Sequence, residues 1–137
     1  MKKNIKKFKG FTLAEVSIAL AVGSIIVAMT FFAFSNVYKI FNLKAYYSTL
    51  WADYDSLKQI VSTFESENLN YSKTLSENEI TYAVGENQTN SLKFLNNQVL
   101  INNEKKREFQ TIKQIQIVSN CVQVEFNNNE NLKFNIG

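Results

Sequence analysis

Glu15 is the residue whose chemistry most needs an explanation, because it lies at the edge of a long uncharged segment. No charged residue occurs from Val16 to Tyr38. A helix of roughly 23 apolar residues is ~34 Å long, which is enough to cross a bilayer. A carboxylate at the centre of such a helix costs on the order of 2.5–3.5 kcal/mol, and less near the interface. Glu15 would therefore gain from a cationic partner.

The residues before this segment are polar and basic. Five lysines occur there: Lys2, Lys3, Lys6, Lys7 and Lys9. Basic residues beside a membrane helix favour the cytoplasmic side for that end of the helix. We therefore expect a cytoplasmic N-terminus and export of the chain that follows the helix. An ordinary signal peptide is a poorer interpretation, because its apolar region runs to only about 7–15 residues.

The composition excludes most kinds of catalytic site. The chain has no histidine, one cysteine and four glycines, so no catalytic triad, zinc cluster or phosphate-binding loop is predicted. We expect neither an enzyme nor a metal or cofactor site. The net charge of +3 becomes −2 once residues 1–10 are removed, because they hold five of the fifteen basic residues. Bulk charge therefore gives no reason to expect nucleic acid as a partner.

Two short polar segments are weaker candidates for binding. Asn127 to Glu130, with Glu125 nearby, carries oxygens that suit calcium, but its carboxylates are few and a solvated turn is favoured. Lys105 to Arg107 is a small basic cluster in a predicted loop. We interpret the cluster as a solvated turn, with a contact to DNA or to an acidic partner subunit as the alternative.

A single helix is predicted from Phe11 to about Glu65, since this stretch contains no proline. Residues 11–38 would form its membrane half and residues 39–66 an amphipathic half. Apolar residues recur along the second half at spacings of three and four: Ile40, Leu43, Tyr47, Leu50, Tyr54, Leu57, Val61 and Phe64. Charged residues, Asp53 among them, lie off this stripe.

Residues 67–137 are predicted to be rich in β-strands, because apolar and polar residues alternate as in an antiparallel sheet with one buried face. Asn68 to Asn78 is predicted to be a loop. Turns are expected at Asn96-Asn97 and at Asn127 to Asn129. Uneven parity from Phe109 to Val118 indicates a β-bulge. A sheet must cover its apolar face, so we expect it to pack on the helix from Tyr47 to Phe64 in an α+β fold.

Gly10, Phe11, Thr12, Leu13 and Glu15, followed by the apolar run, resemble the prepilin leader signature of type IV pilins and type II secretion pseudopilins. The resemblance implies that a prepilin peptidase cuts after Gly10 and that Phe11 is then N-methylated. It implies that Glu15 pairs with the N-terminal amine of a neighbouring subunit as a filament grows. Within one helix, Phe11 and Glu15 at i and i+4 would already be close. The implied fold is pilin-like, a long N-terminal helix packed against a small antiparallel sheet.

The function implied by this resemblance is that of a minor pseudopilin of a type II secretion system. The protein would be anchored in a bacterial inner membrane, with its C-terminal part in the periplasm. Its partners would be the prepilin peptidase, other pilin-like subunits, the inner-membrane assembly platform and membrane lipid. Alternatives within the class are a minor pilin of a type IV pilus and a subunit of a DNA-uptake pseudopilus. The alternative outside the class is a membrane-anchored binding domain that never polymerises.

Overall fold

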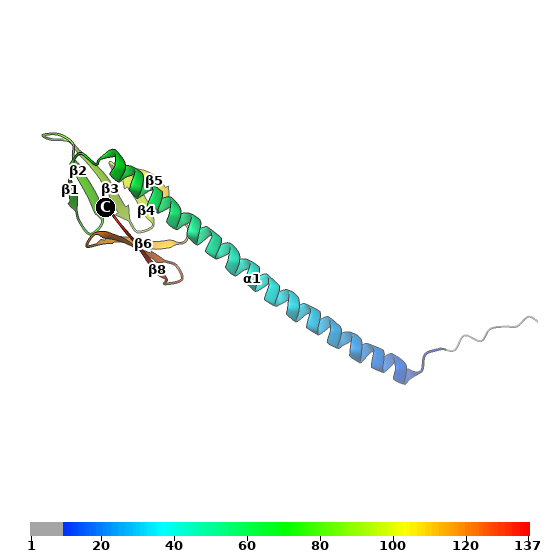
Figure 1. The fold of residues 1–137 in the computed structure, drawn as a ribbon. Coiled ribbons are helices and arrows are strands. Elements are labelled where there is room, and N and C mark those ends of the chain that lie inside the picture. Colours follow the sequence, from blue (N-terminus) through cyan, green and yellow to red (C-terminus); the bar gives the residue numbers. More distant parts are fainter. Residues whose placement is uncertain (1–9) are drawn as a thin grey trace, which may run out of the picture. The chain divides into compact units, whose positions relative to one another are not determined.

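The computed structural model describes residues 10–137 and divides the chain into two compact units. The first unit ends at Leu43 and the second runs from Lys44 to Gly137. Residues 1–9, which hold most of the predicted leader, lie outside the described residues. One helix, α1 (Leu13–Glu67), contributes to both units, and the strands that follow it all belong to the second unit (Figure 1).

The ends of α1 are set by polar side chains. It begins two residues later than predicted, at Leu13, and ends at Glu67. The Asn68 side chain donates a hydrogen bond to the Phe64 carbonyl (2.8 Å) and accepts one from the Asn90 side chain (2.8 Å). The last carbonyls of a helix lack donors within the helix. The buried Asn68 side chain provides a donor for one of them. The predicted loop does begin at Asn68, but only residues 68–71 form a turn before the first strand starts at Ser72.

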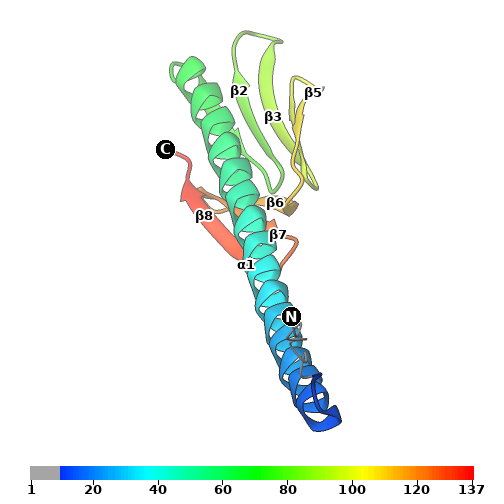
Figure 2. The same ribbon diagram turned by 90° about the vertical axis from the view of Figure 1, so that its right-hand side faces the viewer.

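The second unit contains two antiparallel sheets, where one was predicted. The first is a meander in the order β1-β2-β3-β4-β5, formed by β1 (Ser72–Leu75), β2 (Glu79–Ala83), β3 (Thr89–Leu95), β4 (Gln98–Ile101) and β5 (Glu104–Glu108). The second has the order β6-β7-β8, formed by β6 (Ile112–Val118), β7 (Cys121–Phe126) and β8 (Asn131–Asn135). Both sheets lie beside the part of α1 that belongs to this unit (Figure 2).

The predicted turns and bulge are confirmed. Asn96 lies between β3 and β4 with φ of 54°, and Asn129 lies between β7 and β8 with φ of 64°. Asparagine adopts this left-handed conformation more easily than most residues. The register of β6 against β7 shifts between Ile112 and Gln114, which places the bulge inside the segment where parity was uneven.

Two strands lie where loops were predicted. β1 occupies part of the predicted loop from Asn68 to Asn78, and β5 contains the basic cluster Lys105 to Arg107. β5 is charged at every position and all five of its residues are exposed, so it has no apolar alternation to reveal it. Its backbone pairs with β4, and charged side chains are usual on the outermost strand of a sheet.

The core of the second unit joins α1 to both sheets. Four apolar α1 side chains are buried in it: Leu50, Leu57, Val61 and Phe64. Burying a side chain of this kind contributes about 1.5–3 kcal/mol. They share the core with β-strand residues such as Phe94 of β3 and Phe126 of β7. Ile40 and Leu43, the first members of the predicted stripe, belong to the other unit and are exposed.

Candidate functional site

Gly10 and Phe11 lie just before α1 and are open to solvent. Phe11 is 86% exposed. A Cβ atom built on Gly10 would meet no heavy atom within 4 Å, and its φ is not positive. Neither space nor backbone conformation therefore requires a glycine at position 10 in the described part of the chain.

Thr12 and Glu15 form a capping box at the start of α1. The backbone N–H of Thr12 donates to Glu15 Oε2 (2.8 Å), and the backbone N–H of Glu15 donates to Thr12 Oγ1 (3.2 Å). Two N–H groups that the helix cannot satisfy are thus paired reciprocally. The negative charge of Glu15 also lies where the helix dipole favours it. The helical i, i+4 relation expected between Phe11 and Glu15 is absent, because Phe11 precedes the helix and Thr12 is the partner of the carboxylate.

The segment that follows is suited to lipid in its backbone and in its polar side chains. α1 is long and apolar enough to cross a membrane, and its most apolar stretch is not buried. Two of its hydroxyl groups donate within the helix, that of Ser17 to the Leu13 carbonyl (2.9 Å) and that of Thr30 to the Ile26 carbonyl (2.8 Å). A polar group left unpaired in hydrocarbon would cost several kcal/mol.

The predicted helix–sheet residues lie at the contact between α1 and the two sheets. Leu50, Leu57, Val61 and Phe64 are buried, while Tyr47 and Tyr54 are half-buried against the core. The Tyr54 ring packs edge-on against Phe134 with 5.8 Å between ring centroids, and Phe64 packs similarly against Tyr82 at 5.7 Å. The Phe134 contact belongs to the three-stranded sheet and the Tyr82 contact to the five-stranded sheet. One stripe of a single helix therefore covers both.

Two tyrosine hydroxyls of α1 form hydrogen bonds with β8 and with the residue just before it. Tyr54 donates to the backbone carbonyl of Lys133 (3.3 Å), and Tyr47 donates to Glu130 Oε1 (3.0 Å). The hydrogen bond to Glu130 and the negative charge of that carboxylate raise the pKa of the Tyr47 phenol. One backbone carbonyl of β8 and one side chain just before it are thereby bonded to the helix of the same chain.

Asp53 was predicted to lie off the buried stripe of α1, and this prediction was wrong. It is 6% exposed, and its Oδ2 accepts three hydrogen bonds. The donors are the backbone N–H of Gln110 (3.1 Å), the backbone N–H of Thr111 (2.9 Å) and the Thr111 hydroxyl (2.8 Å). These donors lie between β5 and β6, where neither sheet provides acceptors for the backbone. Asp53 thus holds the segment at which one sheet ends and the next begins.

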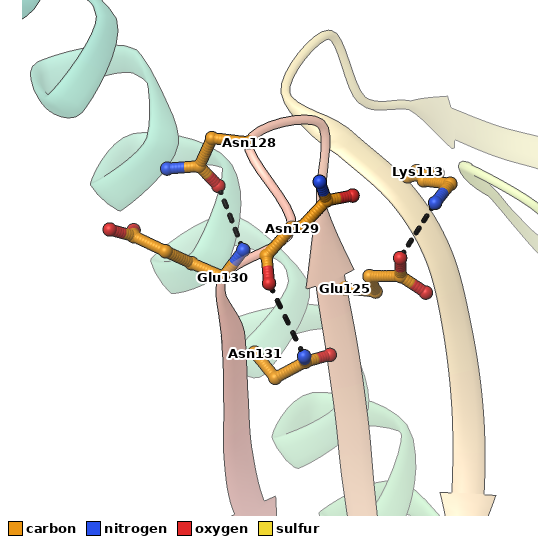
Figure 3. Close-up of polar contacts among 6 residues, drawn as sticks. All are labelled: Lys113, Glu125, Asn128, Asn129, Glu130 and Asn131. Carbon is orange, nitrogen blue, oxygen red and sulfur yellow. Dashed lines mark hydrogen bonds and ion pairs between the residues drawn. The ribbon is translucent and has the colours of Figure 1, made fainter.

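The β7–β8 turn, considered for calcium, uses its oxygens within the protein (Figure 3). Asn128 Oδ1 accepts the backbone N–H of Glu130 (3.1 Å), and Glu125 pairs with Lys113 (2.7 Å). Glu130 is engaged by Tyr47, as described above. No group of three or more histidine, cysteine, aspartate or glutamate side chains placed to hold a metal occurs in residues 10–137. The turn is accounted for by its own hydrogen bonds.

Comparison with known proteins bears on the N-terminal site. Residues 5–31 match the family model of the prokaryotic N-terminal methylation motif, and they include Gly10 to Glu15. No curated protein and no solved structure matches the chain. The motif indicates the type IV pilin-like and pseudopilin class, whose members are structural subunits. Such a leader implies processing by a prepilin peptidase and assembly with other pilin subunits, and the apolar α1 fits a membrane-anchored protein of this kind.

Proposed function

We propose that this protein is a minor pseudopilin of a type II secretion system, processed by the prepilin peptidase and assembled into a periplasmic filament. One observation carries the proposal: the N-terminal methylation motif at residues 5–31 extends into a helix whose most apolar stretch is unburied, and this helix is long and apolar enough to cross a membrane. The protein then acts by assembly and not by catalysis.

Cleavage after Gly10 would explain a glycine that the fold does not need. Since no atom of the described residues 10–137 crowds position 10 and φ is ordinary there, we attribute the small residue to a requirement outside the fold. A peptidase that must bring its catalytic groups close to the scissile backbone supplies such a requirement, because glycine allows close approach. Phe11, which is fully open, would become the methylated N-terminal residue.

Glu15 would set the axial register of the filament. Cleavage converts the amide nitrogen of Phe11 into an amine. Phe11 directly precedes Thr12, whose N–H donates to the Glu15 carboxylate. The carboxylate is therefore within reach of its own amine, and a neighbour's amine would compete for it. A buried ion pair adds little net stability, but a buried charge without its partner is strongly unfavourable. The pair therefore favours the axial position of the subunit at which both charges meet.

The proposed topology follows from charge. The lysines of the leader favour the cytoplasm for the N-terminus, so the unit from Lys44 to Gly137 would be periplasmic. Within this unit, Tyr47, Leu50, Tyr54, Leu57, Val61 and Phe64 would hold the two sheets on α1. The sheets would then face neighbouring subunits while the membrane half of α1 lies in the filament core.

An accessory role is favoured by the small size of the second unit. Glu125 and Glu130, the carboxylates at the β7–β8 turn, are engaged by Lys113 and Tyr47, as in a structural turn. The alternatives are a minor pilin of a type IV pilus, a subunit of a DNA-uptake pseudopilus, and an anchored binding domain that never polymerises.

Deleting the gene distinguishes these functions. We expect export of the substrates of type II secretion to fall to background and to return with the wild-type gene, while twitching and transformation persist. A loss of twitching or of transformation with secretion intact would move the protein to a pilus or to DNA uptake. If all three activities are retained, the anchored binding domain becomes the better account.

A further inference from the structure

A groove of about 550 Å³ lies in the second unit, between the last turns of α1 and the outer part of the five-stranded sheet. Its apolar residues are Ile60 and Phe64 of α1 and Ile101 of β4. Its cationic residues are Lys106 and Arg107 of β5. This volume is within the range of sites that hold a bound group, about 300–1,000 Å³.

A β-bulge is the reason that two consecutive cations line the same groove. In a regular strand, neighbouring side chains point to opposite faces. Here Arg107 pairs with Val99 and Lys105 pairs with Leu100, so Lys106 has no partner on β4. A bulge of this kind changes the direction of a side chain, and both Lys106 and Arg107 reach the groove.

The charges in the groove are only partly balanced by the chain itself. Lys105, on the same strand, pairs with Glu108 and lowers the pKa of that carboxyl. Arg107 lies over the ring of Phe109, 5.5 Å from its centroid. No ion pair in residues 10–137 involves Lys106 or Arg107. Glu67 is the acidic residue among those lining the groove, which leaves one net positive charge there.

The strand beside the groove is also open at its backbone. β5 is the outermost strand of its sheet, and all five of its residues are exposed (Figure 2). An outermost strand has a row of backbone N–H and C=O groups that can pair with another extended segment.

We propose that this groove binds an extended acidic segment of another protein. A carboxylate of that segment pairs with Lys106 and Arg107, a large apolar side chain rests on Ile60 and Phe64, and the backbone runs along β5. This mode of recognition combines strand pairing with side-chain pockets. An apolar floor and two cations suit a peptide better than a nucleic acid, whose binding relies on many phosphate contacts. The inference concerns only the second unit and does not depend on filament assembly.

The test uses the full-length chain in neutral detergent micelles and a fluorescent synthetic peptide that alternates valine and glutamate, read by anisotropy. Replacing Lys106 and Arg107 with glutamine should weaken binding on the order of tenfold. Lys105→Gln is the control matched to Lys106→Gln, since each removes one positive charge from the same strand but Lys105 lies outside the groove, and it should change affinity by less than about twofold. Glu67→Gln should strengthen binding, because it removes the opposing charge.

Several results would overturn the proposal. If Lys105→Gln weakened binding as much as the double variant, only general surface charge would be involved. If a peptide with lysine in place of glutamate bound equally well, the cations would have no role. A short DNA duplex that bound tightly with the same dependence on Lys106 and Arg107 would assign the groove to nucleic acid. Lys106→Gln alone, at an exposed position, replaces the double variant if the latter misfolds.

Discussion

Replacing Glu15 with alanine should leave membrane insertion and leader cleavage intact and abolish filament assembly. The amine of Phe11 would remain charged in the filament core with no carboxylate to pair with it. Breaking a buried charge pair in this way costs about 3–5 kcal/mol, which lowers association more than a hundredfold. The measurement compares the mature protein in membranes with the protein in sheared filaments. Assembly at the wild-type level would contradict the role proposed for Glu15.

Thr12→Val is the control that separates helix capping by Glu15 from pairing of Glu15 with the amine. Glu15 caps α1 together with Thr12, and loss of such a cap costs about 1 kcal/mol. Thr12→Val removes the hydroxyl partner of the cap but keeps the Glu15 charge. We expect it to assemble far better than Glu15→Ala. Equal defects in the two variants would mean that helix capping, and not pairing with the amine, explains the requirement for Glu15.

Replacing Asp53 with alanine should destabilise the second unit by on the order of 3 kcal/mol. Three donors from Gln110 and Thr111 would lose a buried, charged acceptor, and each donor left unsatisfied carries a desolvation penalty. The measurement is denaturant unfolding of the full-length chain in micelles, followed by Trp51 fluorescence. Asp55→Ala, two residues along the same helix at an exposed position, should change the free energy of unfolding by less than about 0.5 kcal/mol. Equal losses for the two variants would exclude the anchoring role of Asp53.

The helix was predictable because its signals are local. Leu50, Leu57 and Phe64 recur at helical spacing, and no proline interrupts them. The Asn-rich turns were predictable for the same reason, since a positive φ is a property of one or two residues. Leucine and phenylalanine at helical spacing indicate that one face of the helix is buried. They do not indicate that two sheets cover this face.

The division into two sheets depends on contacts that no local pattern reveals. It occurs where Asp53 of α1 binds backbone groups of Gln110 and Thr111, more than fifty residues away in sequence. A signal did exist, because position 53 is three residues after Leu50 and four before Leu57, on the buried face. Predictions from hydrophobic patterns treat every charged residue as exposed, so Asp53 was placed outside the core. For the same reason they miss a strand such as β5, which contains no apolar residue.

The intact mass and N-terminal residue of the protein extracted from its own membrane test the filament function most directly. We expect a chain that begins with N-methylated Phe11. A chain that still begins at Met1 or Lys2, in cells that contain the prepilin peptidase, would show that the bond after Gly10 is not cut. A chain that begins after Ser35 would make the apolar segment a signal peptide. Either result would contradict the filament function.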